Sequence, residues 1–223
     1  MQLICTSQPS TEPITLAQAK AHLRQDGTDD DALITNLIIA ARTHAETVCR
    51  RAFVTQTWKL VLDLFPTPAM NISSANWYGP QWGIGPGPLS VTAPAGQTGY
   101  EIYLPLPSLQ TVGSINYIDQ NGVQQTLDPT LYKVGTVSEP GRLTPAYAQT
   151  WPATRNEASA VEITYTCGYG AAAAVPAAIQ SWMLLRVGAL YENREEVLVG
   201  TRLVVADLNF VDRLLDPYRV LSF

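Results

Sequence analysis

The chain has 223 residues, of which 46% are hydrophobic and 15% are charged, whereas ordinary globular proteins carry roughly 25% charged residues. This apolar content excludes wholesale disorder, and a chain of this length can bury a real core. The formal net charge of −5 argues against a protein that holds nucleic acid by neutralising its phosphates. We expect that some of the uncharged residues form a surface that becomes buried against a partner.

The first fifty residues are predicted to be helical. Thr15 and Gln18 fit a capping box at the start of a short helix, which would end with Gly27 as its C′ residue. The acidic residues 29–31 then begin a second helix, where the helix dipole favours negative charge. Apolar residues recur at helical spacing over 34–48. We therefore expect two antiparallel helices.

A different period follows, because polar and apolar residues alternate over 56–64 as in a half-buried strand. The Asn-Gly pair at 121–122 predicts the turn of a hairpin. Further strands are predicted at 101–104, 114–118, 123–127, 131–134, 141–143 and 161–166. Together these strands would form a small antiparallel sheet.

A long segment between Leu64 and Tyr100 contains no charged residue and is rich in proline and glycine. Trp77, Tyr78 and Trp82 lie within it, and disordered linkers are seldom so aromatic. Two interpretations stay open. The segment is either a flexible surface insertion or a docking loop that orders against a neighbouring subunit or partner.

The last fifty residues return to a helical pattern, which begins at Pro176. One apolar stripe spans 179–191, and a second spans 204–215 before Asp216-Pro217 ends it. The predicted fold class is α+β, with an antiparallel helical bundle from the N- and C-terminal helices, a β-rich insertion and a long Gly/Pro-rich loop. The expected domains are residues 1–53 for the N-terminal helices, 54–168 for the β-rich insertion with its loop at 66–100, and 169–223 for the C-terminal helices and tail.

Few residues have the pattern of a catalytic or metal site. His22 and His44 lie in predicted helices, where a surface or packing role is favoured over a catalytic triad. The acidic residues 26–31 do not have EF-hand spacing, so helix capping explains them better than calcium. The three cysteines are far apart and form no CxxC pair, which fits free thiols in a reducing cytoplasm. We expect no enzyme, no cofactor, no metal, no secretory signal and no membrane helix.

The segment Gly168–Ala173 formally matches the pattern G-x-G-x-x-A between a predicted strand and a predicted helix. A dinucleotide site needs this motif inside a βαβ unit, and no second parallel strand is predicted downstream. The Walker lysine is also missing. We interpret the segment as a flexible strand-to-helix connection.

Several segments, taken in their order along the chain, resemble those of a known protein family. They are residues 14–24, 29–34, 55–58, 104–110, 165–170 with Val175-Pro176, and 191–195. Over about residues 14–197 the chain resembles the head-tail connector, or adaptor, proteins of long-tailed bacteriophages, the gp6-like group. The resemblance implies a four-helix core with a β-rich insertion. It further implies a structural protein that forms a ring, expected to be a dodecamer, below the capsid portal.

The expected partners follow from the same resemblance. They are other copies of the chain, the phage portal protein, and the next neck or tail-completion protein. DNA would pass through the lumen without specific binding, which an acidic lumen favours by repelling phosphate. The expected location is the head-tail interface of the virion, and the host cytoplasm during assembly. The alternatives are a tail-completion or head-closure protein of the neck and, from another class, a small hydrolase or nucleotide-binding enzyme.

Candidate partner-binding residues are the large apolar side chains of the uncharged loop and of the region after Gly200. They are Trp77, Tyr78, Trp82, Leu203, Leu208, Phe210, Leu214, Tyr218 and Phe223. Deleting the residues after Gly200 is expected to abolish portal attachment and to leave the rest of the fold soluble.

Overall fold

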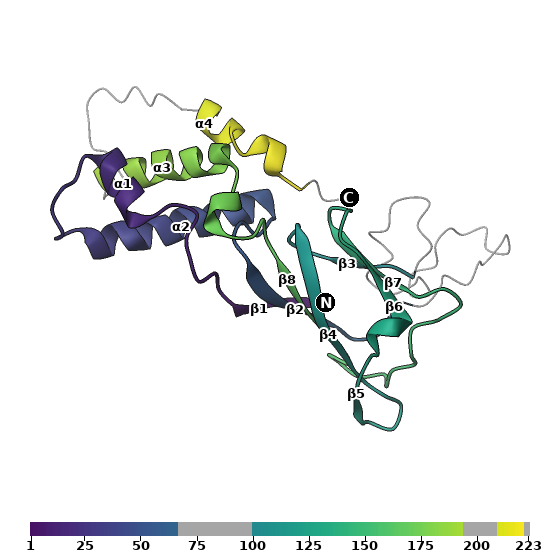
Figure 1. Cartoon of the computed structure of the whole chain (residues 1–223). Helices are drawn as coiled ribbons and strands as arrows, with labels where there is room; N and C mark the ends of the chain where they lie inside the picture. The colour runs from purple at the N-terminus through teal and green to yellow at the C-terminus, as the bar shows by residue number, and fades with distance from the viewer. Residues whose placement is uncertain (67–99, 194–208, 221–223) are drawn as a thin grey trace, which may run out of the picture. The chain divides into compact units, whose positions relative to one another are not determined.

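The computed structural model describes residues 1–66, 100–193 and 209–220 (Figure 1). The chain divides into two compact units. The sheet unit contains Met1–Gln8 and the described part of Gln56–Cys167, and the helix unit contains Pro9–Thr55 and the described part of Gly168–Val220. No helix in these described ranges is long and apolar enough to cross a membrane.

The sheet unit contains two antiparallel sheets. The larger has the strand order β1-β2-β8-β4-β5, formed by Gln2–Ser7, Gln56–Leu62, Val161–Cys167, Leu109–Ile118 and Gln124–Thr126. The smaller has the order β3-β7-β6, formed by Ile102–Leu104, Gly141–Pro145 and Tyr132–Gly135. Strands distant in sequence are thus neighbours in space, because β8 lies between β2 and β4.

One face of the larger sheet is the core of the sheet unit. Side chains along β8 alternate between buried and half-buried, as expected for a strand with one covered face. Leu60, Ile163 and Ile115 lie side by side on the covered face and are fully buried. The hydroxyl of Tyr165 on this face donates to the carbonyl oxygen of Pro105, directly after β3, at 2.9 Å. The opposite face of the larger sheet is described below as the outer sheet face.

The helix unit contains α1 (Leu16–Leu23), α2 (Asp31–Cys49), α3 (Ala177–Glu192) and the short α4 (Asn209–Arg213). The capping box predicted for α1 is confirmed, since Thr15 Oγ1 accepts from the amide of Gln18 and Gln18 Oε1 accepts from the amide of Thr15. The helix ends earlier than predicted. Arg24 adopts the left-handed conformation with φ of 55°, so Gly27 is not the C′ residue.

The apolar core of the helix unit joins α2 to α3 (Figure 1). Buried side chains of this core form one stripe on each helix, and the segment after α4 adds one more. They are Ile34, Ile38, Ala41, Ala45 and Cys49 of α2, Ile179, Trp182, Met183 and Val187 of α3, and Leu215. Ile14, Ala19 and Phe53 are buried in the same core. The 3.6-residue spacing of these side chains in the sequence accounts for both helices.

The predicted fold class is wrong in its main feature, because an antiparallel bundle of N- and C-terminal helices is not what the chain forms. In the described residues there are eight strands in two antiparallel sheets, which is more strand than predicted. Residues 2–7, within the region predicted as helical, form β1 and pair with β2. Of the stripe predicted over 204–215, residues 209–215 are described, and only Asn209–Arg213 of them form the helix α4. The predicted strands overlap β2 to β8, but they belong to two sheets rather than one.

The hairpin turn predicted at 121–122 is present between β4 and β5. Gly122 has a φ of +82°, and its amide donates to the carbonyl oxygen of Asp119 at 2.9 Å. The carboxylate of Asp119 accepts from the amides of Asn121 and Val123, both at 2.9 Å, and from Nε2 of Gln125 at 3.1 Å. These hydrogen bonds hold the pKa of Asp119 below its ordinary value of 3.8, and the bond from the amide of Val123 has the largest effect.

This lowered pKa predicts an acid-sensitive turn. Because the folded-state pKa lies below the unfolded value, the stabilisation is fully present above the ordinary value of 3.8 and is lost as the pH falls through the folded pKa. In an NMR acid titration, the amide signals of Asn121 and Val123 should move with a midpoint below 3.8. The transition should disappear in Asp119→Asn. A midpoint at or above 3.8 in the unaltered chain contradicts this prediction.

Candidate interaction surfaces

Most of the predicted partner-binding side chains cannot be placed. Trp77, Tyr78, Trp82, Leu203, Leu208 and Phe223 lie outside the described residues, and so does the side chain of Phe210 in α4. Leu214 and Tyr218 are described. Both are partly buried and pack against the core of the helix unit. Their contact with a partner stays a prediction, and the structure gives each of them a contact within its own chain.

Three hydrogen bonds connect the segment that contains Leu214 and Tyr218 to the rest of the helix unit. Nε1 of Trp182 donates to Asp212 Oδ1 at 3.1 Å, and Nε of Arg51 donates to the carbonyl oxygen of Tyr218 at 3.2 Å. The amide of Val220 donates to the carbonyl oxygen of Cys49 at 2.9 Å. Leu215 is 1% exposed. A deletion after Gly200 therefore also removes part of this core, and it is not a clean test of portal attachment.

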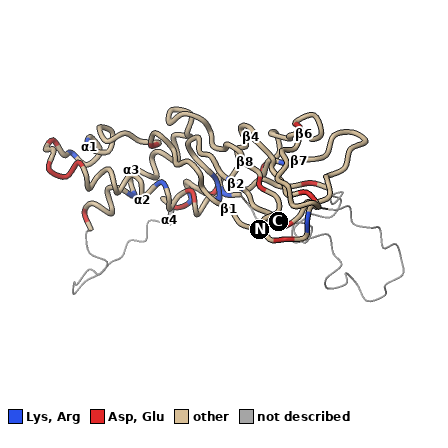
Figure 2. The backbone as a smooth tube through the Cα atoms, turned by 90° about the horizontal axis from the view of Figure 1, so that it is seen from below, with Lys and Arg blue, Asp and Glu red and all other residues tan. Residues whose placement is uncertain are grey.

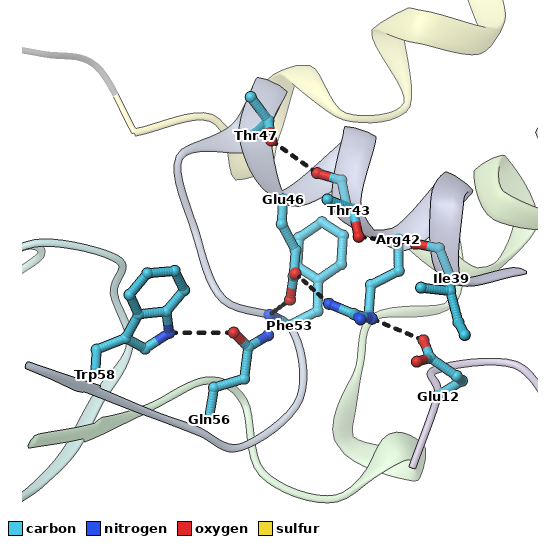
Figure 3. Close-up of polar contacts among 9 residues, drawn as sticks. All are labelled: Glu12, Ile39, Arg42, Thr43, Glu46, Thr47, Phe53, Gln56 and Trp58. Atoms are coloured by element: carbon cyan, nitrogen blue, oxygen red, sulfur yellow. Dashed lines mark hydrogen bonds and ion pairs between the residues drawn. The ribbon is translucent and has the colours of Figure 1, made fainter. Parts of the chain in front are cut away.

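A buried arginine connects three parts of the helix unit (Figure 3). Arg42 of α2 is 4% exposed. Its Nε donates to Glu12 and its Nη1 to Glu46, both at 2.7 Å, and the other oxygen of Glu46 accepts from the amide of Phe53 at 2.8 Å. Burial by itself lowers the pKa of Arg42, but the charges of Glu46 and Glu12 raise it above its ordinary value. Through this cluster, the segment before α1 and the turn after α2 are both held against α2.

Neither histidine lies in a catalytic arrangement in the described part of the chain. The ring of His44 stacks on that of Trp182, with centroids 5.9 Å apart and 8° between the planes. Nε2 of His22 lies against α3, where a Cβ on Gly188 would be 3.4 Å away. Within residues 1–66, 100–193 and 209–220, no three His, Cys, Asp or Glu side chains are placed to hold a metal ion.

The three cysteines form no disulfide. Cys49 and Cys167 are buried, whereas Cys5 on β1 is partly exposed. Burial raises the pKa of Cys49 to about 11, which leaves very little thiolate at neutral pH. Cys49 therefore has a packing role in the core of the helix unit.

The G-x-G-x-x-A segment is a packed connection and not a phosphate cradle. The amide of Tyr169 donates to the carbonyl oxygen of Phe53, and the carbonyl oxygen of Gly170 accepts from the amide of Thr55, both at 3.0 Å. A Cβ on Gly168 would lie 2.5 Å from the carbonyl oxygen of Val54. The segment is thus packed and hydrogen-bonded against the backbone of residues 53–55, whereas a flexible connection was predicted.

The outer sheet face has an unusual composition that only the strand register reveals. Three rows of side chains cross the strands, from β1 toward β5. The first row is Ser7, Thr57, Thr166 and Thr111, the second is Ile4, Lys59, Thr164 and Ser114, and the third is Gln2, Val61, Glu162, Asn116 and Thr126. The two charged residues of this face are Lys59 and Glu162, and they pair with each other at 2.9 Å. Figure 2 shows how sparsely Lys, Arg, Asp and Glu are distributed along the described part of the chain.

Two exposed apolar side chains were missed by the sequence analysis. Val137, in the turn between β6 and β7, is 97% exposed, and Tyr147, shortly after β7, is 93% exposed. Such side chains occur singly on many surfaces and need no special explanation. The sequence signal that could have found Val137 is an apolar residue inside the otherwise polar and proline-bounded stretch 136–140.

The fold of the chain is similar to that of solved particle components. One match covers 100% of this chain and 97% of a chain in the neck of an empty GTA particle computed with C6 symmetry, with a TM-score of 0.72 and 18% identity. The same coverage holds for a chain in the neck of a native GTA particle computed with C12 symmetry, with a TM-score of 0.69 and 17% identity. It also holds for a chain in the virion of a native gene transfer agent (GTA) particle, with a TM-score of 0.69 and 18% identity. At these identities the likeness establishes the fold.

One family model matches the N-terminal part of the chain. Residues 13–75 match the family model of the phage gp6-like head-tail connector protein, a range that contains α1, α2 and β2. The resemblance found in residues 14–24, 29–34 and 55–58 is thereby confirmed for the part of the chain that the family model matches. No curated protein sequence matches the chain.

Proposed function

We propose that the chain is a structural head-tail connector, or adaptor, which forms a ring below the capsid portal and links head to tail around the DNA channel. The observation that carries this proposal is the likeness of fold over nearly the whole of both chains to a component of a GTA neck. The gp6-like match over residues 13–75 supports the same role. Both support a location at the head-tail interface of the virion, and we expect the chain in the host cytoplasm during assembly.

The ring is supported by the symmetry of the similar structures. The neck structures that contain the similar chains were computed with C6 and C12 symmetry. A ring of identical subunits needs two different contact surfaces on each copy, since the contacts are heterologous and close on themselves. We propose a dodecamer whose partners are the portal protein and the next neck or tail-completion protein.

A structural role without catalysis fits the described side chains. His22 and His44 are engaged in helix packing, and the glycine-rich segment at 168–173 is occupied by backbone contacts. The net charge of −5 fits a channel that repels DNA phosphates and lets the duplex slide. The contact roles of Trp77, Tyr78, Trp82 and of the region after Gly200 belong to this proposal.

Imaging the chain after mixing it with portal protein tests the proposal. A connector should form a ring directly on the portal. A tail-completion or head-closure protein, the alternative, should leave the portal bare and occupy another level of the neck.

A further inference from the structure

We infer that the outer sheet face is the surface on which the next copy of the chain packs in the ring. This inference rests on the proposed function, because a ring subunit has to bury one surface against each of its neighbours. The centre of the face is the row of four hydroxyl side chains that crosses β1, β2, β8 and β4 at Ser7, Thr57, Thr166 and Thr111.

The face can lose its water at little cost. Burying an unpaired charge is expensive, and the usual solvated face of a sheet carries several lysines and glutamates. Here Lys59 and Glu162 neutralise each other, and their side chains are already only 31% and 33% exposed. The hydroxyls can satisfy one another when water leaves, as Thr111 and Thr166 already do at 2.6 Å. The threonine methyl groups and Ile4, 39% exposed at the β1 end, supply apolar contact.

The size of the face fits the centre of one subunit contact. Five strands at a spacing of ~4.8 Å and three rows of side chains two residues apart cover roughly 400 Å². A standard interface takes about 800 Å² from each partner, and its core is depleted in charged residues while its rim is polar. The outer sheet face therefore has the area and the composition of an interface core, with a rim still to be added around it.

A second copy is the occupant that these features favour. The other face of the same sheet is already filled by the buried row Leu60, Ile163 and Ile115 and closed by Tyr165 at Pro105. On the outer face Val61 is buried, at 6% exposed, whereas the hydroxyl row at Ser7, Thr57, Thr166 and Thr111 keeps exposed surface for a partner. A ring repeats this surface, with its single ion pair, at every subunit, where a second copy can bury it. The portal and the next neck protein are the other occupants that the experiment distinguishes.

The test places one charge on the face. Thr166→Lys introduces an ammonium group on the central strand β8, between Thr57 and Thr111, where a lysine extends into water in the free chain. Thr136→Lys makes the same substitution in the exposed turn between β6 and β7 and is the matched control. Thr166→Val keeps the size and neutrality of threonine. Thermal unfolding of each purified chain shows that it is folded before assembly is measured.

We expect at least a tenfold loss of ring-bearing portals for Thr166→Lys, counted by electron microscopy, and counts close to the unaltered chain for Thr136→Lys and Thr166→Val. Maleimide labelling of a thiol introduced by Thr57→Cys, followed by peptide mapping to separate it from Cys5, gives a second readout. The thiol should react in the free chain and be protected in the ring before any further neck protein is added.

Rings that form normally from Thr166→Lys, or an introduced thiol that stays reactive in the ring, overturn the inference and leave the connector function standing. Protection that appears only after the next neck protein is added also overturns it and assigns the face to that protein. If the unaltered chain makes no ring on the portal, the proposed function fails, and the inference fails with it.

Discussion

Replacing Arg42 by methionine should lower the free energy of unfolding by about 3–5 kcal/mol, the usual cost of leaving a buried charge without its partner. Methionine fills similar space but leaves the carboxylates of Glu12 and Glu46 facing each other without a cation. These side chains are only 23% and 13% exposed, so water screens the loss poorly. Urea unfolding, followed by circular dichroism, measures the change.

Two further variants separate the charge effect from packing. The triple variant Arg42→Met, Glu12→Gln and Glu46→Gln removes the unpaired charges and should recover most of the lost stability, because well-packed neutral replacements of buried ion pairs are often tolerated. Arg186→Met changes an exposed arginine of α3 and should stay within about 0.5 kcal/mol of the unaltered chain. If Arg42→Met is as mild as Arg186→Met, the cluster does not hold the helix unit together.

Gly168→Ala should destabilise the chain by about 3 kcal/mol or more, because backbone strain and a collision each contribute roughly 1–3 kcal/mol. Gly168 has a φ of +121°, and its added Cβ would lie 2.5 Å from the carbonyl oxygen of Val54. Neither the connection at 168–170 nor residues 53–55 can move without breaking the hydrogen bonds between them. The melting temperature should fall by roughly 10 °C for a chain of this size.

Two other glycines divide this effect into its parts. Gly170 has a φ of +124°, but the nearest atom to an added Cβ, the Cβ of Ala174, would be 3.8 Å away. Gly170→Ala therefore measures backbone strain alone. Gly113 has ordinary backbone and an ordinary contact of 3.5 Å, so Gly113→Ala should be nearly neutral. Calorimetry of the three variants should rank them Gly168, Gly170, Gly113 in decreasing loss. An equal loss at Gly168 and Gly170 would show that the collision at Val54 does not occur.

Local patterns predicted the local structure. The capping box of Thr15 and Gln18 lies within one helical turn, and the alternation of buried positions along β8 lies within one strand. β1 was missed because its partner β2 begins about fifty residues later, and nothing within Gln2–Ser7 records that pairing. The helix end at Arg24 was missed because glycine, the usual left-handed residue, occurs three positions farther on. The domain boundaries predicted after residues 53 and 168 stay predictions.

The functional surfaces depend on register and on distant contacts, so the sequence indicated them only in part. The spacing of Arg42 and Glu46 could predict a helical ion pair, but Glu12 joins it from thirty residues away. Leu214 and Tyr218 were predicted to face a partner, because an apolar side chain near a chain end does not record which surface covers it. The hydroxyl row on the outer sheet face becomes visible only when β1, β2, β8 and β4 are aligned.

The low charge of the chain now has a partial structural explanation. Outside the uncharged stretch between Leu64 and Tyr100, the outer sheet face contributes a surface on which Lys59 and Glu162 cancel. An assembly subunit can use such a surface, since it becomes buried once the ring has formed.

Cryo-electron microscopy of the purified chain mixed with portal protein shows whether the chain is a connector. We expect a closed ring of twelve copies, as in a neck with C12 symmetry, seated on the portal and open along its axis. Portals that remain bare at saturating concentrations of the chain, or density at another level of the neck alone, would contradict it.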